Sequence, residues 1–313
     1  MARAGIDAED PVTGRRVLAG NQHVTLCWWA GGACASPLAT TAVGDELVYV
    51  QEGTARLETA LGALELGPGD HAVVPAGLIH RWVVHGPAQL LVVEAAGGHV
   101  DVPAKHLTER GQLREGAPYS ERDVRVPTAP LVVEDDGPVD VLVRTRSGLT
   151  RHVRQSHPFD VVGWDGCAYP WAFQILDLEP VDGRLHQPPP VHQTFAGPRF
   201  VVCAFVPRPY DFDPDAVKVP YHHANVDSDE VLFYSRGDFM SRQGSGIGAA
   251  SISLHPAGFT HGPQPGSLEA SLAQDRTEEV AVMIDTFDPL LLSPEALATE
   301  DPDYWRSWAG GMP

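Results

Sequence analysis

The sequence predicts an all-β fold made of two repeated units. Of the 313 residues, 31 are glycine and 28 are proline, and turn-forming residues this frequent interrupt long helices. Between the turns lie short apolar runs, rich in Val, Leu and aromatic residues, that are typical of strands. These runs are Glu46–Gln51, Ala72–Pro75, Gln89–Glu94, Val139–Arg144, Phe200–Val206, Val231–Tyr234 and Glu279–Asp285.

An internal repeat indicates the two units. The segment Gly69–His80 has the pattern G-x5-P-x-G-x2-H, and Pro256–His261 repeats its second part, P-x-G-x2-H. Upstream of each motif, a glutamate is followed by six residues and a glycine. These pairs are Glu46 with Gly53 and Glu230 with Gly237. Self-similarity at this scale is typical of a duplicated unit.

We therefore expect an N-terminal unit over residues 1–125 and a C-terminal unit with a tail over residues 126–313. Helical signals are few. Short helices are expected near Pro103–Gly111 and over Ser293–Leu297, where Ser293 would be the N-cap and Pro294 would occupy the first helical position. The aromatic-rich segment Asp301–Trp308 is expected to pack as a tail or a short helix.

The charge of the chain excludes several classes of partner. Lys and Arg number 22 and Asp and Glu number 41, which gives a formal net charge of −19. Such a surface repels phosphate backbones and anionic lipids, so we expect no nucleic-acid partner and no membrane partner. An anionic substrate would need a local cation. The sequence has no apolar run of about 18 residues, the length of a membrane span.

The cysteines and the first residues indicate the compartment. Cys27, Cys34, Cys167 and Cys203 form no C-x-x-C pair and are too sparse for a disulfide framework. Residues 1–10 do not have the pattern of a signal peptide. We therefore expect a reduced, cytoplasmic protein.

Two histidines and a glutamate in the C-terminal unit form the strongest candidate for a functional site. His223 precedes Glu230, and His261 ends the second P-x-G-x2-H motif. Two imidazoles and one carboxylate leave open positions on a divalent metal, as in non-haem Fe(II) oxygenases, although Mn and Co share these ligands. The alternative is a hydrated surface turn, because Asp227–Asp229 are turn formers. His222 would point to the opposite face of a strand and is expected to be structural.

These motifs resemble the signatures of the cupin superfamily. The first signature is His223-x-Asn225-x4-Glu230-x6-Gly237, and the second ends at His261. More narrowly, the chain resembles the homogentisate 1,2-dioxygenase family. The segments that carry this narrower resemblance are Asp160–Gly166, Pro220–Asn225, Ser253–His255 and Thr260–Pro263.

The resemblance implies a fold, an activity and a set of metal ligands. It implies two cupin β-barrels in one chain and an Fe2+-dependent, extradiol-type cleavage of a dihydroxylated aromatic acid such as homogentisate, with both atoms of O2 inserted. The metal ligands of the family match His223, Glu230 and His261. The family spaces its His and Glu more closely, which makes Asp229 an alternative. Glu230 is preferred because it keeps the six-residue spacing to Gly237.

The same resemblance implies acid–base residues. The loop Arg184–His192 matches a loop whose histidine accepts the proton of a substrate hydroxyl. His186 is the better match, and His192, which would also contact the substrate, is the alternative. An imidazole suits this task because its pKa lies near neutrality. His255 matches a second active-site histidine, and a buried histidine bonded to the backbone is its alternative.

Three further residues are expected to contact the substrate. Tyr221 and Phe239 would form aromatic walls, against the alternative of plain core packing. Arg242 stands where the family has a pocket lysine, and its guanidinium group would bind the substrate carboxylate. The family commonly has a tyrosine at the position of Phe239, so a gentisate-, hydroquinone- or salicylate-like phenol is an alternative substrate. A non-catalytic metal-binding cupin is the alternative from another class.

The N-terminal unit retains only part of the ligand set. It keeps Glu46 and His80, but Ala35–Gly44, the region before Glu46, contains no histidine. We therefore expect this unit to bind no metal and to pack against the catalytic unit. Apolar faces and exposed strand edges favour a homo-oligomer. The expected partners are a small aromatic substrate and O2.

Overall fold

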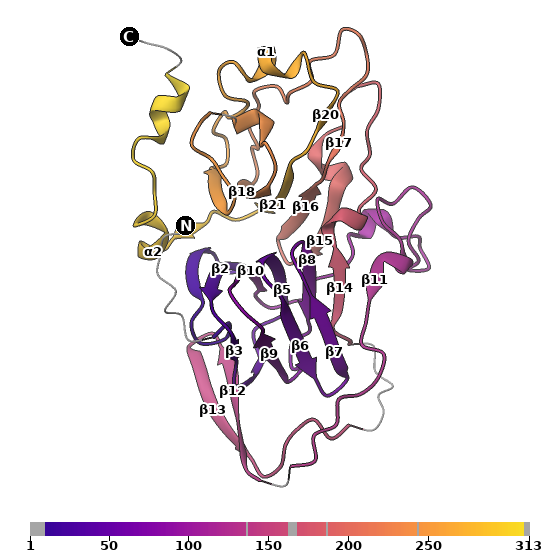
Figure 1. Ribbon diagram of the computed structural model, residues 1–313, viewed down its shortest axis with the longest axis vertical. Coiled ribbons are helices and arrows are strands. Elements are labelled where there is room, and N and C mark those ends of the chain that lie inside the picture. Colours follow the sequence, from indigo (N-terminus) through magenta and orange to yellow (C-terminus); the bar gives the residue numbers. More distant parts are fainter. Residues whose placement is uncertain (1–9, 136, 162–167, 186, 243, 310–313) are drawn as a thin grey trace.

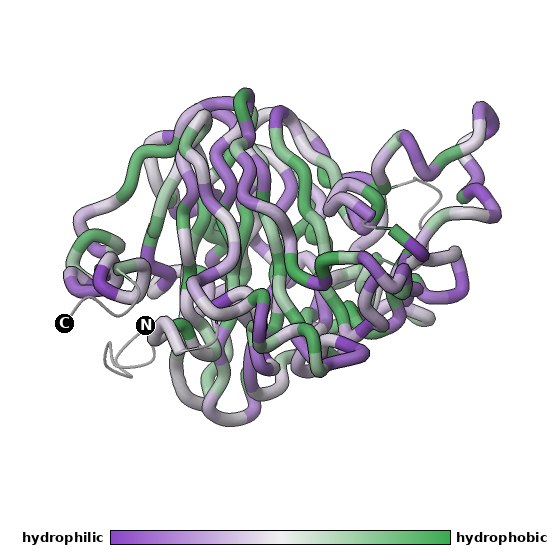
Figure 2. The backbone as a smooth tube through the Cα atoms, turned by 90° about the horizontal axis from the view of Figure 1, so that it is seen from above, coloured by the Kyte–Doolittle hydropathy of each residue, from purple (hydrophilic) through white to green (hydrophobic). Residues whose placement is uncertain are grey.

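The computed structural model describes residues 10–135, 137–161, 168–185, 187–242 and 244–309. Strands dominate the chain, and the expected all-β fold is confirmed (Figure 1). Each of the seven apolar runs forms a strand within one or two residues of its expected bounds. In Figure 2, hydrophobic stretches run along these packed strands. Among the described residues, no helix has the length and apolar character needed to span a membrane.

Two sheets form the N-terminal unit. The first has the order β11-β14-β8-β5-β10-β2-β1-β22, and the second has the order β13-β12-β4-β9-β6-β7, with β3 paired to β9. The strands of the first sheet are β1 (Arg16–Gly20), β2 (Val24–Gly31), β5 (Glu46–Glu52), β8 (Asp70–Val74), β10 (Ala88–Ala95), β11 (Val124–Arg125), β14 (Trp171–Gln174) and β22 (Leu291–Leu292). Those of the second are β3 (Cys34–Ala35), β4 (Leu38–Thr41), β6 (Ala55–Thr59), β7 (Gly62–Leu66), β9 (His80–Val84), β12 (Val139–Thr145) and β13 (Gly148–Arg154).

The two sheets enclose the core of the N-terminal unit. Trp29 and Val48 of the first sheet share a buried cluster with Leu57 and Trp82 of the second. Alternate residues of a strand point to opposite faces of the sheet, so each sheet also has a second face, which points away from this core. The second face of the eight-stranded sheet packs against the C-terminal unit.

The C-terminal unit contains a five-stranded sheet of order β15-β16-β21-β18-β19 and a two-stranded ribbon of β17 and β20. Their bounds are β15 (Gln193–Gly197), β16 (Phe200–Phe205), β17 (Arg208–Pro209), β18 (Asp229–Arg236), β19 (Ser251–His255), β20 (Arg276–Thr277) and β21 (Val280–Thr286). One face of the larger sheet packs on the N-terminal unit, where Phe233 lies 5.7 Å from Trp28 and 5.9 Å from Tyr49 between ring centroids. Its other face lines a cavity.

The sheets divide the chain at a different point from the expected boundary at residue 125. Strands β12, β13 and β14 follow that residue, yet β12 pairs in parallel with β4 and β14 pairs with β8. The division between the sheets therefore falls between β14, which ends at Gln174, and β15, which begins at Gln193. A late strand also returns, because β22 pairs with β1.

The helices are short. They are α1 (Ser267–Ser271), α2 (Pro294–Leu297) and the 3-10 helices η1 (Ala104–His106), η2 (Glu121–Asp123), η3 (Ile175–Asp177), η4 (Pro189–His192), η5 (Met240–Arg242) and η6 (Tyr304–Trp308). The prediction for α2 is confirmed, since the Ser293 hydroxyl accepts a hydrogen bond from the amide of Ala296 at 3.0 Å. The expected segment Pro103–Gly111 contains only η1, and the expected tail contains η6. The structure describes a single chain, so the homo-oligomer stays a prediction.

Candidate metal centre

The structure brings together the side chains of His223, Glu230 and His261. Glu230 lies near the start of β18, and the other two residues form an isolated antiparallel bridge. Their backbones exchange two hydrogen bonds of 2.9 and 2.8 Å, which hold the imidazole centroids 4.4 Å apart. One ligand atom from each of the three residues lies within 4.8 Å of the others. This spacing allows all three to bind one ion.

Hydrogen bonds select the ring nitrogen that each histidine presents. Nδ1 of His223 lies 2.9 Å from the carbonyl oxygen of Tyr221, and Nδ1 of His261 lies 3.0 Å from that of Phe259. Since a carbonyl only accepts, each Nδ1 carries the proton and each Nε2 keeps its lone pair. Nε2 of His261 is buried without a hydrogen-bond partner, 3.5 Å from the Glu230 carboxylate. An orphaned buried nitrogen of this kind fits a metal ligand.

The Glu230 carboxylate is held at both oxygens. Nδ1 of His255 donates to Oε1 at 2.7 Å, and the side-chain amide of Asn225 donates to Oε2 at 2.9 Å. Burial alone would raise the pKa of Glu230, but the hydrogen bond from His255 and the proximity of His261 hold that pKa below its usual range. The carboxylate is therefore ionised and oriented before any ion binds.

Asp229, the alternative ligand, points elsewhere. Its two carboxylate oxygens accept hydrogen bonds of 2.8 Å from the backbone amides of Ala257 and Leu290. Adjacent strand residues face opposite sides of a sheet, which separates Asp229 from Glu230. Asp229 thus fixes two loops, and the geometry favours Glu230 as the carboxylate of the triad.

His255 and Arg242 form a second layer around the triad. The guanidinium group of Arg242 lies 3.2 Å from Nε2 of His255, so that nitrogen accepts and Nδ1–H donates to Glu230. The His255 ring stacks on His261 with centroids 4.2 Å apart, and burial lowers its pKa. Both ring nitrogens are occupied, so His255 positions Glu230 in this structure.

The donors of Arg242 are largely committed to the protein. The side chain is buried, its Nε donates to the Tyr234 hydroxyl at 3.0 Å, and one terminal nitrogen donates to the Gly262 carbonyl. The other terminal nitrogen contacts His255. Arg242 lines the cavity, but it does not present the free fork that carboxylate binding was expected to use.

The triad opens into a cavity of about 730 Å³ on the exposed face of the five-stranded sheet. Tyr221 lines it and is 66% exposed, which places this ring near the rim. Phe239 is only 4% exposed and packs edge-on against the Tyr234 ring, 5.1 Å between centroids. Within the described part of the chain, Phe239 is not a lining residue, so it supports the cavity wall from behind.

The two histidines of the upstream loop have different outcomes. His186 lies outside the described residues. His192 lines the cavity, is buried, and accepts a 2.9 Å hydrogen bond at Nε2 from the amide of Val181. Burial, followed by the charge of Arg208, lowers the pKa of His192 to about 4. This neutral, engaged imidazole is a weak proton acceptor.

Sequence reasoning did not single out Asp285, which lines the cavity beside the triad. It lies on β21 in register with Glu230, and its Oδ1 is buried without a hydrogen-bond partner. Burial and the nearby charges of Glu230 and Asp227 raise the pKa of Asp285 to about 7. The sequence does contain a signal for this residue, because Asp285 is the one charged residue of the otherwise largely apolar strand β21.

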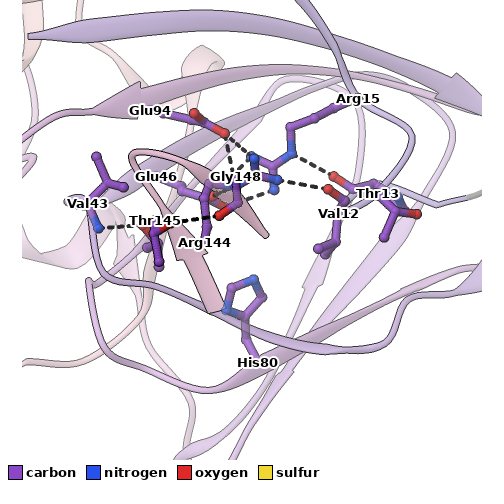
Figure 3. A network of polar contacts seen from close by, with 12 residues as sticks. Val12, Thr13, Arg15, Val43, Glu46, His80, Glu94, Arg144, Thr145 and Gly148 are labelled. Atoms are coloured by element: carbon purple, nitrogen blue, oxygen red, sulfur yellow. Dashed lines mark hydrogen bonds and ion pairs between the residues drawn. The ribbon is translucent and has the colours of Figure 1, made fainter. Parts of the chain in front are cut away.

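The corresponding region of the N-terminal unit is occupied by arginines (Figure 3). Arg15 lies 3.0 Å from Glu46 and 2.8 Å from Glu94, while Arg144 lies 3.3 Å from Glu94 and 3.7 Å from Glu46. In the view of Figure 3, His80 lies below this network. The guanidinium groups satisfy the carboxylate that a metal would require, which supports the expectation of a metal-free unit.

Comparisons with known proteins agree on one family. A sequence profile described as the homogentisate 1,2-dioxygenase N-terminal region matches residues 25–175. A protein of Saccharolobus solfataricus, provisionally named a dioxygenase, is 41% identical over 84% of this chain and 68% of its own length. Homogentisate 1,2-dioxygenase of Emericella nidulans is 27% identical over 85% of this chain. The chain spans 62% of that enzyme.

Among solved structures, a cupin 2 conserved barrel domain protein from Leptotrichia buccalis aligns with 87% of this chain and 89% of its own. Its sequence identity is 8% and its TM-score is 0.38.

Proposed function

The chain belongs to the homogentisate 1,2-dioxygenase family of cupin proteins, and from this premise we propose that it is an Fe(II)-dependent ring-cleaving dioxygenase. Its substrate would be homogentisate or a similar dihydroxylated aromatic acid, and both atoms of O2 would enter the product. The observation that carries the proposal is the convergence of His223, Glu230 and His261.

The donor set fits iron. Two neutral imidazole nitrogens and one carboxylate form the 2-His-1-carboxylate set that non-haem Fe(II) oxygenases use, with positions left for other ligands. Iron bound there would supply the redox and Lewis-acid chemistry that couples an aromatic ring to O2. The buried, unpartnered Nε2 of His261 would gain its missing partner.

The remaining residues prepare this site for a phenol. The carbonyls of Tyr221 and Phe259 fix the tautomers of the two imidazoles, and His255 fixes the carboxylate. The cavity on the same face has room for an aromatic ring beside the triad. His186 is the proposed acceptor of the phenol proton on the strength of the sequence, because His192 is already engaged.

Oxygen uptake tests this function. The protein is loaded with Fe(II) under anaerobic conditions and then given O2 with homogentisate, gentisate, hydroquinone or salicylate. Uptake with homogentisate, and a ring-opened product carrying two atoms of labelled oxygen, is the expected result. Uptake with a different phenol would replace the substrate and keep the reaction class. No uptake with any of the four, despite stoichiometric iron, would favour a non-catalytic metal-binding protein.

A matched pair of variants tests the ligand assignment. His223→Ala is expected to abolish both iron retention and oxygen uptake. His222→Ala removes the neighbouring imidazole, which is not part of the triad, and is expected to preserve both. Iron retained by the first variant, or lost equally from both, would contradict the proposed ligand set.

A further inference from the structure

The two lysines of the chain both line the cavity of the candidate metal centre. They are Lys105 and Lys218, and the other basic residues are arginines. The ammonium group of Lys218 contacts the carbonyls of Leu272 and Gln274 and lies 3.7 Å from Asp275. Within the described ranges, Lys105 has neither a hydrogen-bond nor an ion-pair partner. One of the two ammonium groups is therefore free to bind a ligand.

Lys105 comes from the N-terminal unit but is fixed to the C-terminal sheet. Before it, Asp101 forms an antiparallel bridge with Ala196 of β15 through two hydrogen bonds of 2.9 Å. After it, Nε2 of His106 lies 2.7 Å from the carbonyl oxygen of Gln193. Helix η1 thus lies against the edge strand of the five-stranded sheet. This attachment on both sides directs Lys105 toward the cavity.

The wall around Lys105 carries a second cation. Arg208 lines the same cavity, and the charges of Lys105 and Arg208 both act on His192, the residue that directly precedes β15. The positive charge of Arg208 is partly compensated, because its guanidinium group lies 3.7 Å from the Glu279 carboxylate and over the Phe205 ring. Asp182 is the acidic group of this wall that acts on His192. Lys105 is the cation of the wall with the fewest competing partners.

The separation from the triad suits an aromatic acid. Lys105 lies near Cys203 of β16, since its charge opposes the rise that burial causes in the pKa of that thiol. Cys203 pairs with Met283 of β21, which pairs with Leu232 of β18. Two strand spacings of about 4.8 Å therefore place β16, the strand near Lys105, about 10 Å from β18, which carries Glu230. A substituted ring with a short acid side chain, met by a flexible lysine, spans such a gap.

We propose that Lys105 binds the carboxylate of the substrate, so that the N-terminal unit contributes a substrate-binding residue to the centre in the C-terminal unit. This inference rests on the proposed function, and it assigns the role that was expected of Arg242 to a different cation. An ammonium group in a cavity of a protein with net charge −19 supplies the local attraction that an anionic substrate requires. Discrimination between an aromatic acid and its neutral analogue should then depend on Lys105.

Chemical protection tests the inference without turnover. The full-length, anaerobic, Fe(II)-loaded protein is treated with an amine-acylating reagent, and its two lysine-containing peptides are quantified by mass spectrometry. Homogentisate should slow acylation of Lys105 at least several-fold, whereas its methyl ester should not. Lys218 is the internal control, and its acylation should not respond to the carboxylate. Equal protection by acid and ester, or none by either, would overturn the inference.

Variants provide a second, independent measurement. Charge-assisted hydrogen bonds are lost in Lys105→Met, so binding of homogentisate under anaerobic conditions should weaken about 10-fold to 100-fold. Binding of the methyl ester should stay within about 2-fold, and Lys105→Arg should recover part of the acid binding. In Lys218→Met, the ratio of acid to ester affinity should match that of the parent protein. An unchanged ratio in Lys105→Met would refute the assignment.

The two proposals fail in different ways. Protection of Lys105 by an aromatic acid, without oxygen uptake on any phenol, would support the lysine as an acid-binding residue and reject the dioxygenase. Oxygen uptake with undiminished preference for the acid in Lys105→Met would keep the dioxygenase and reject the role of Lys105.

Discussion

Replacing Arg15 by Met should strongly destabilise the N-terminal unit. Arg15 lies 3.0 Å from Glu46 and 2.8 Å from Glu94, and its side chain is 5% exposed. It also donates to the carbonyl of Pro11 at 2.9 Å. Without it, Arg144 remains near the two carboxylates, at 3.7 and 3.3 Å. Leaving a buried charge without its partner costs about 3–5 kcal/mol, which is the expected loss in the free energy of unfolding.

The loss in the free energy of unfolding should become larger as the pH rises. In the parent protein, burial would raise the pKa of Glu46, but the charge of Arg15 holds it below its usual value, so this carboxylate stabilises the fold above that value. In Arg15→Met, the charge that lowers the pKa of Glu46 most is gone, while burial and the charge of Glu94 still raise it. The pKa of Glu46 in the folded state should therefore rise above its value in the unfolded state. Such a group favours the fold at low pH and loses that contribution as the pH rises. The deficit should therefore be largest at mildly alkaline pH and shrink at mildly acidic pH.

Urea unfolding of the metal-free protein at both pH values measures this effect. Arg16→Met is the matched control, because Arg16 is the adjacent arginine and is exposed. Its free energy of unfolding should change by less than about 0.5 kcal/mol. The reasoning is wrong if Arg15→Met loses less than about 1 kcal/mol, or if its deficit is the same at both pH values.

Four further substitutions probe the C-terminal unit. His255→Ala removes the donor that orients Glu230 at 2.7 Å and should weaken iron binding about 10-fold to 100-fold, as measured by competition with a chelator; unchanged affinity would contradict its positioning role. Asp229→Ala should lower the free energy of unfolding by about 1–3 kcal/mol yet retain iron in the folded fraction, whereas Glu230→Ala should lose the iron. Asp285→Asn replaces a half-buried carboxyl whose Oδ1 is buried without a hydrogen-bond partner and whose pKa is raised to about 7, so the free energy of unfolding of the metal-free protein should rise by about 1–3 kcal/mol at mildly alkaline pH; a decrease there would mean that this carboxylate has a stabilising partner.

The strands and the triad could be read from the sequence because their signals are local. A buried strand such as β21 requires a continuous apolar run, and the turn before β18 carries His223 at a fixed spacing from Glu230. His261 was found through its P-x-G-x2-H motif. The structure brings it to His223 through a two-residue bridge that no single-segment pattern reveals.

Contacts between side chains that lie far apart in the sequence could not be predicted in this way. Arg242 was expected to hold a substrate because its residue type suits a carboxylate, yet the fold places the Tyr234 hydroxyl and the Gly262 carbonyl within its reach. Lys105 has no motif around it and gains significance only because η1 docks on β15. The boundary at residue 125 differed for the same reason, since β12 pairs in parallel with a strand about 100 residues earlier.

The duplicated sheets place a second carboxylate beside the first in both units, and the cation that neutralises them distinguishes the units. Glu94 is the cross-strand neighbour of Glu46, and Asp285 is the corresponding neighbour of Glu230. In the N-terminal unit, two guanidinium groups balance the two carboxylates and leave no charge for a metal.

In the C-terminal unit, the donors to Glu230 are an imidazole N–H and an amide, which orient the carboxylate without cancelling its charge. A single divalent ion would neutralise the two carboxylates as the two arginines do in the N-terminal unit. It would also leave coordination positions open for a substrate. This difference in charge balance is the physical basis for expecting a metal in the C-terminal unit and none in the N-terminal unit.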